Sequence, residues 1–150
     1  MVFYLHIGTD PTTWLVPQES AIDAVAQELA QATGPVVLPV KFPLAGTLVL
    51  SVRSAGAVWV ASPPPMGIHP SGAKLPAPLI YVSSAVAATP ETPGGYPLPP
   101  ATDLAKLQQD IQSAMSGGNI LSIPVVHMGL GAALVLSGMS LAYAVLCPAG

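Results

Sequence analysis

Residues that could carry acid–base or metal chemistry are few in this sequence, and they are far apart. The three histidines, His6, His69 and His127, lie in three separate segments of the chain. A metal site needs several ligands at short spacing, such as two histidines one helical turn apart, and acid–base catalysis needs two groups that face each other. Neither pattern occurs. We therefore predict no catalytic residue, no metal site and no cofactor, and we favour a non-enzymatic protein.

The single cysteine, Cys147, restricts the thiol chemistry that the chain can perform. One cysteine excludes an intrachain disulfide and a zinc site built from several cysteines. Because its neighbours are apolar, we predict that Cys147 is a small buried hydrophobic residue. The alternatives are a reactive thiol and a disulfide between two molecules.

Aromatic residues could instead line a pocket for a small apolar ligand between the two halves of the chain. The candidate ligand-binding residues are aromatic or histidine and come from both halves: Tyr4, His6, Trp14, Trp59, Tyr81, His127 and Tyr143. A lining of this kind suits a small hydrophobic ligand. The same side chains could form a hydrophobic core, and for each aromatic residue we favour that interpretation.

Charged residues are scarce along the whole chain. Asp, Glu, Lys and Arg make up 7% of the 150 residues, while 51% are hydrophobic; about 25% is the usual charged fraction of a soluble domain. The net charge of −3 provides no basic field that could neutralise phosphates, so we expect no nucleic-acid partner. We expect part of the surface either to consist of small residues and proline or to be buried against a partner.

An internal repeat predicts the elements that would position these residues. The motif Leu-Val-Leu-Ser at residues 48–51, followed after two residues by Ser54, recurs at residues 134–137, followed by Ser140. Further segments align in the same order: residues 3–5 with 80–82, 14–17 with 96–99, and 57–61 with 143–147. An ordered series of matches is hard to obtain by chance, and it favours a tandem duplication.

Two helices are predicted at equivalent places in the repeat. Residues 20–29 align without gaps with residues 102–111, and both segments carry apolar residues at the spacing of one helix face. Ser20 and Thr102 stand where an N-cap hydroxyl is expected, and glycines follow each segment as predicted helix ends. Short apolar runs bounded by glycine, proline and serine predict strands around each helix.

These observations predict an α+β fold made from two copies of a strand-strand-helix-strand-strand unit with a further strand at its end. We expect repeat 1 at residues 1–62, a proline-rich linker at residues 63–78 and repeat 2 at residues 79–150. A unit of this size is only marginally stable alone. We therefore predict that the repeats share one core and pack with pseudo-twofold symmetry.

Residues 120–147 contain no Asp, Glu, Lys or Arg and could be interpreted as a membrane-spanning helix. The stretch exceeds the roughly 20 residues that cross a bilayer. Its counterpart in the repeat, residues 36–62, contains Lys41 and Arg53 and shows three short apolar runs typical of strands. We therefore predict strands in both segments and disfavour a membrane contact. The first eight residues lack a signal-peptide pattern, which favours a cytoplasmic location.

Several predicted strands are apolar on both faces, and such strands need cover on both faces. Two short helices cannot provide it, so we expect the other repeat's sheet or another subunit to do so. The leading hypothesis is a self-associating structural, scaffold or assembly protein whose partner is itself or a larger protein assembly. The first alternative is a protein or enzyme that binds a small apolar ligand in a cavity between the repeats. The second is a membrane-anchored accessory subunit held by residues 120–147.

Overall fold

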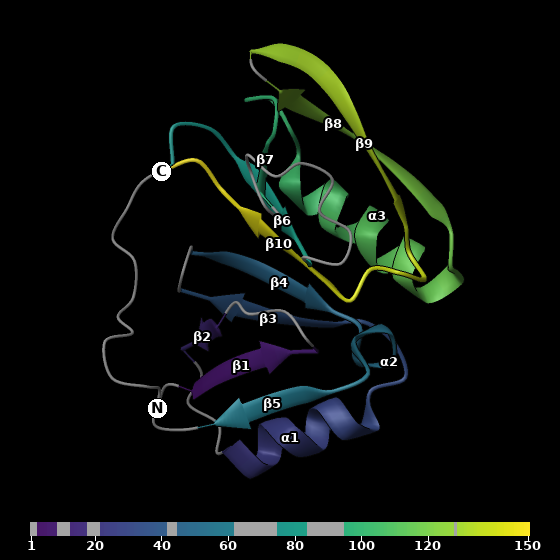
Figure 1. Ribbon diagram of the computed structural model, residues 1–150. Helices are drawn as coiled ribbons and strands as arrows, with labels where there is room; N and C mark the ends of the chain where they lie inside the picture. Colours follow the sequence, from purple (N-terminus) through teal and green to yellow (C-terminus); the bar gives the residue numbers. More distant parts are fainter. Residues whose placement is uncertain are drawn as a thin grey trace.

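The computed structural model describes residues 3–8, 13–17, 22–41, 45–61, 75–83, 95–127 and 129–150. They form an α+β fold (Figure 1). In the first half the elements are β1 (Phe3–Ile7), β2 (Thr13–Val16), α1 (Ile22–Gln31), β3 (Val36–Val40), β4 (Gly46–Leu50), α2 (Val52–Ala55) and β5 (Val58–Ala61). In the second half they are β6 (Leu79–Val82), β7 (Gly95–Pro97), α3 (Leu104–Gly117), β8 (Ile120–His127), β9 (Leu130–Ser137) and β10 (Tyr143–Cys147).

The strands pair in the same pattern in each half, and every pair is antiparallel. The first strand pairs with the second and with the last: β1 with β2 and β5, and β6 with β7 and β10. The two strands after the main helix form a hairpin, β3–β4 in one half and β8–β9 in the other. The halves are joined where β4 pairs with β10, which creates a five-stranded sheet in the order β3-β4-β10-β6-β7.

The five-stranded sheet is the central layer of the molecule, and it has a hydrophobic core on each face (Figure 1). Strand alternation sends Leu48 and Leu50 into the core shared with β1, β2 and α1, and sends Val49 into the core shared with α3, β8 and β9. All five residues of β10 are buried. The two-sided cover expected for these apolar strands is therefore provided by both halves of the same chain.

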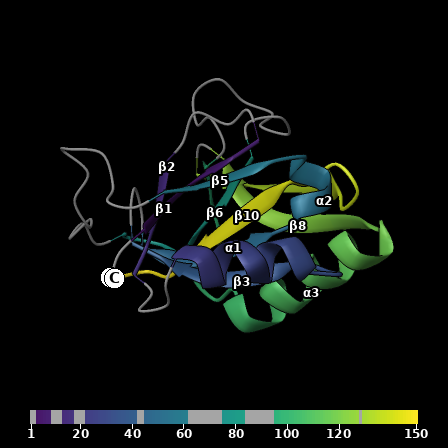
Figure 2. The same cartoon turned by 90° about the horizontal axis from the view of Figure 1, so that it is seen from below.

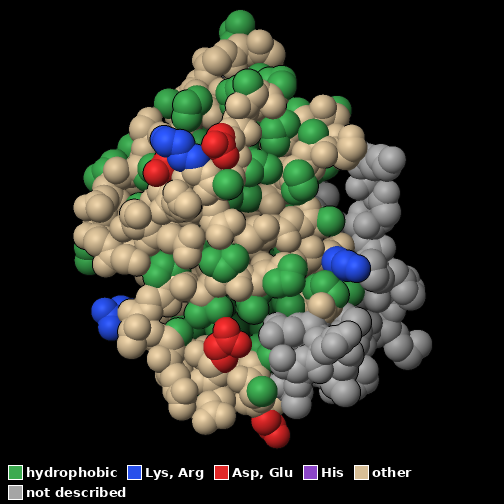
Figure 3. Space-filling view, turned by 180° about the vertical axis from the view of Figure 1, so that it is seen from behind, with side chains coloured by type: hydrophobic (Ala, Val, Ile, Leu, Met, Phe, Trp, Pro, Cys, Tyr) green, Lys and Arg blue, Asp and Glu red, His purple; other side chains and the backbone are tan. Residues whose placement is uncertain are grey.

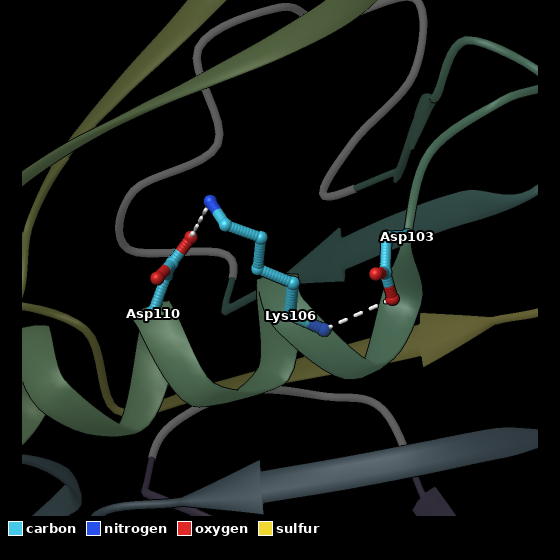
Figure 4. A network of polar contacts seen from close by, with 3 residues as sticks. All are labelled: Asp103, Lys106 and Asp110. Atoms are coloured by element: carbon cyan, nitrogen blue, oxygen red, sulfur yellow. Dashed lines mark hydrogen bonds and ion pairs between the residues drawn. The ribbon is translucent and has the colours of Figure 1, made fainter.

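The third helix shows how the local sequence sets an element's ends. The N-cap is Asp103, whose Oδ1 accepts a hydrogen bond from the backbone N–H of Lys106 at 3.2 Å (Figure 4). The prediction of Thr102 as N-cap was wrong, because the Thr102 hydroxyl donates to the Pro99 carbonyl at 2.7 Å. Gly118 ends the helix in the left-handed conformation. The predicted N-cap at Ser20 lies outside the described residues.

Seen from below, α1 and α3 run in roughly the same direction (Figure 2), but they pack into different cores: Val25 and Leu29 of α1 belong to the core shared with β1 and β2, and Leu107 and Ile111 of α3 belong to the core shared with β8 and β9. α1 contacts β5, whereas α3 contacts β8, β10 and β4. The helix α3 therefore touches a strand of the first half as well as strands of its own half. This contact helps to fix the junction between β4 and β10.

Residues 120–147 form β8, β9 and β10 rather than a helix. In the part of the chain that the structure describes, no helix is both long enough and apolar enough to span a bilayer. Glycines separate the apolar run into strands: Gly129 adopts a positive φ of 77° in the turn between β8 and β9, and Gly138 lies in the turn after β9. The described part of residues 120–147 therefore consists of strands, as the comparison with residues 36–62 predicted.

The way the halves are joined differs from the predicted pseudo-twofold packing. In the sequence repeat, β4 corresponds to β9 and β10 corresponds to β5. If a twofold axis related the two halves, the β4–β10 pair would therefore be matched by a β9–β5 pair. Among the described residues, β5 pairs only with β1 and β9 pairs only with β8. The junction is therefore head-to-tail: the second hairpin strand of one half meets the last strand of the other.

Candidate functional site

Three of the candidate ligand-binding residues form an aromatic cluster on the outer face of the β2-β1-β5 sheet. Tyr4, His6 and Trp59 alternate with core residues along β1 and β5, so they lie on the face away from the core. The ring centroids of His6 and Trp59 are 5.7 Å apart, and those of Tyr4 and His6 are 5.8 Å apart. Tyr4 is buried and His6 half-buried, while Trp59 is exposed.

Three other candidates pack together inside the molecule. The ring of Trp14 meets the rings of Tyr81 and Tyr143 edge-on, at centroid distances of 5.4 and 5.7 Å. Trp14 and Tyr143 are fully buried in the core shared with β1, β2 and α1, and Tyr81 packs against this core. The indole Nε1 of Trp14 has no hydrogen-bond partner among the described residues. This cluster fills the space between the halves.

The seventh candidate, His127, is the last residue of β8, and its side chain is outside the described part of the structure. The seven residues are therefore divided between the outer face of one sheet, the core and the end of a hairpin. The sequence places them on apolar strands but does not show which face of each strand will be covered.

An open cleft does lie between the halves, at a place that the aromatic candidates did not indicate. Its volume is about 380 Å³, and its lining comes from the α2 segment, the end of α3 and the turn after β9: Ser51, Arg53, Ser54, Met115, Ser116, Gly117, Gly118 and Met139. The Ser54 hydroxyl donates to the Met139 carbonyl at 3.0 Å, which ties the two halves together. The lining combines serine hydroxyls and the Arg53 guanidinium with the side chains of Met115 and Met139, and the residues that form it include no acidic or imidazole group.

Metal ligands do not converge in the described part of the chain: no group of three His, Cys, Asp or Glu residues there could hold an ion. Cys147 is fully buried, which confirms its prediction as a small buried hydrophobic residue. Burial raises the pKa of the Cys147 thiol from 9.0 to about 11, because removing the thiolate from water is unfavourable. The thiol is therefore protonated at neutral pH and inaccessible to reagents.

Exposed apolar side chains gather on the second hairpin and the turn that follows it. Large hydrophobic residues with most of their surface exposed are Ile120 (69%), Leu130 (72%), Val135 (62%) and Met139 (72%), and on β5 Trp59 (62%). Figure 3 shows, on the face seen from behind, apolar side chains with only a few charged groups between them. Ile120 and Leu130 lie at opposite ends of the β8–β9 hairpin, so the exposed apolar side chains are spread along it. Exposed apolar surface on one element is a candidate interaction site.

Two strand edges add backbone groups to this apolar surface. In the part of the chain that the structure describes, β5 and β9 each pair along one edge only. An unpaired edge presents a row of N–H and C=O groups that another strand can bind. The exposed Trp59 and Val135 lie on these two strands.

Comparison of the chain with protein-family models, with curated proteins and with solved structures finds no match. The candidate site is therefore defined by its own geometry: apolar side chains on strands whose outer edges are open.

Proposed function

We propose that this protein is a non-enzymatic, self-associating structural or assembly protein. The observation that carries the proposal is the open edge of β9, a strand on which Leu130 and Val135 are mostly exposed. Burying apolar surface stabilises an interface by about 25 cal/mol per Å². A protein with few charges on its surface has little repulsion to keep such a strand away from another molecule.

Strand pairing gives this surface a defined way to associate. An edge strand binds a second strand through main-chain hydrogen bonds, while the side chains on alternate positions provide specificity. Native proteins usually protect edges with lysine, proline or a bulge. The exposed residues near the middle of β9 are Ala133 and Val135, and neither is a protecting residue.

The tandem duplication belongs to the same proposal. The two halves repeat the strand pairing described above and, apart from α2, the element order, which supports two copies of one ancestral unit. A chain of two such units resembles a fused dimer, so the contact that joins the units within the chain is a model for contacts between chains.

The proposal is tested by measuring molar mass as a function of protein concentration, by light scattering after size exclusion. We expect the mass of the parent to exceed 15.2 kDa and to rise with concentration. Val135→Lys places a charge on the open edge of β9 and should return the protein to the monomer mass. Ala105→Lys, on the exposed surface of α3, is the matched control and should behave as the parent. A parent that stays at 15.2 kDa at every concentration contradicts the proposal.

A further inference from the structure

The junction between the two halves of the chain has a counterpart that the described residues do not form within one molecule. Within the molecule, β4 pairs with β10 with Val49 opposite Ala144 and Leu48 opposite Val145. The repeated Leu-Val-Leu-Ser motif makes β9 the counterpart of β4, because Val135 occupies the place of Val49. The counterpart of β10 is β5. The unmade pair is therefore β9 with β5.

Backbone hydrogen bonding independently supports the equivalence of β5 and β10. Each is the last strand of its half and pairs antiparallel with the first strand. Just beyond each pair, a backbone bond continues the ladder: Gly8 N–H donates to the Ala57 carbonyl at 2.7 Å, and Ser83 N–H donates to the Tyr143 carbonyl at 3.2 Å. The acceptors Ala57 and Tyr143 are aligned in the sequence repeat, whereas Ser83 aligns with His6, so the register with the first strand differs by two residues between the halves.

Equivalent residues are buried on the strands of the internal junction and exposed on β5 and β9. Val49 is fully buried in the core shared with α3, β8 and β9, whereas its counterpart Val135 is 62% exposed. On the other strand of the junction, Val145 is fully buried, whereas its counterpart Trp59 is 62% exposed. Trp59 on β5 and Val135 on β9 thus stand at positions that the internal junction buries.

We infer that β9 of one molecule pairs antiparallel with β5 of a second molecule, in the register of the internal β4–β10 pair. This rests on the proposed self-association and specifies its geometry. Val135 then lies opposite Val58, and Leu134 lies opposite Trp59. The partner is a second copy because both complementary edges belong to this chain, and because the new pair continues a junction already made within it.

The inferred contact joins unlike edges, so it has a direction. Strand contacts run from the free edge of β5 through β1 and β2 to β3, across the five-stranded sheet to β7, and then through β8 to the free edge of β9. Each molecule therefore offers one edge of each kind. Head-to-tail contacts of this type produce a closed ring or an open filament.

The register is tested by disulfide cross-linking between molecules. The test chain carries Val58→Cys and Val135→Cys in a Cys147→Ala background and is oxidised mildly. Opposite residues in antiparallel strands have Cα atoms roughly 4.5–5.5 Å apart, within the span of a disulfide. We expect a ladder of covalent dimers, trimers and larger species. The matched control, Val60→Cys with Val135→Cys, moves one cysteine two residues along the same face and should lose the ladder.

Single-cysteine variants test the direction of the contact. Val58→Cys alone and Val135→Cys alone should each remain uncross-linked, while their equal mixture should give a covalent dimer and nothing larger. A covalent dimer from either variant alone would show that like edges pair, and would overturn the inference. If the parent associates but the double variant gives no ladder, the inference fails and the proposed self-association stands. If the parent is monomeric at every concentration, both fail.

Discussion

Cys147, the last residue of β10, titrates differently in the folded and unfolded chain. Burial raises its pKa from 9.0 to about 11, whereas the unfolded chain exposes the thiol to water. Between pH 9 and 11 the unfolded state therefore binds fewer protons than the folded state, and the free energy of unfolding falls as the pH rises. Below pH 9 both states keep the thiol protonated, so Cys147 causes no pH dependence there.

We expect this titration to lower the free energy of unfolding by about 2–3 kcal/mol between pH 9 and pH 11, at 1.36 kcal/mol per unit of pKa difference. The measurement is urea denaturation at a series of pH values. Cys147→Ala is the control, because it leaves the tyrosines and lysines unchanged and removes only the thiol. Parallel curves for the parent and this variant across the range would contradict the assignment.

Aromatic residues illustrate what the sequence can and cannot predict at the scale of single residues. Trp14 and Trp59 both lie on apolar strands, yet Trp14 is fully buried and Trp59 mostly exposed. The difference depends on which face of the strand another sheet covers, and that cover comes from residues distant in sequence. The sequence pattern places both tryptophans on apolar strands, but it does not show which of the two side chains is buried.

At the scale of elements, Gly138 marks a close approach between the turn after β9 and the end of α3. A Cβ placed on Gly138 would overlap the carbonyl oxygen of Ala114, and this neighbour is helix backbone that cannot turn aside. The Gly138 N–H also donates to the Asn119 carbonyl at 2.9 Å. This turn is therefore held against α3 at a distance that only glycine allows.

Gly138→Ala should lower the free energy of unfolding by about 1–3 kcal/mol, the usual cost of overpacking. Chemical denaturation of parent and variant at one protein concentration measures the change. Gly131→Ala, on β9, is the matched control, because an added Cβ there meets no atom within 4 Å; its effect should stay within about 0.5 kcal/mol. Equal stability of the two variants would show that the turn and α3 can separate without cost.

The sequence predicted most strands but not how they are joined. The apolar runs predicted as strands at residues 36–38, 47–50 and 58–60 lie within β3, β4 and β5, and their counterparts in residues 120–147 lie in β8, β9 and β10, as expected from their length and their glycine and proline breaks. The pairing of β4 with β10 was not predicted, because antiparallel partners are chosen by contacts far apart in the chain. The helix α2 was also missed, since its four residues are too few to show a helical period.

At the scale of the whole molecule, the strand contacts among the described residues end at the open edges of β5 and β9, and the proposed assembly follows from these two edges. Two variants would each block one end. Trp59→Lys places a charge on β5, and Val135→Lys places one on β9; both residues are mostly exposed, so neither change should disturb the core. Circular dichroism should show the parent fold in both. Each variant retains the edge that the other has lost.

Mixing the two variants should restore a single contact. Alone, each variant should have the monomer mass of 15.2 kDa, because in the inferred contact its intact edge meets the blocked edge of a second copy. In an equal mixture, the intact β9 of Trp59→Lys can pair with the intact β5 of Val135→Lys, which gives a dimer with no further growth. Light scattering of the separate and mixed samples measures this. A mixture that stays monomeric, or that grows beyond the dimer as the parent does, would contradict a head-to-tail contact between these two strands.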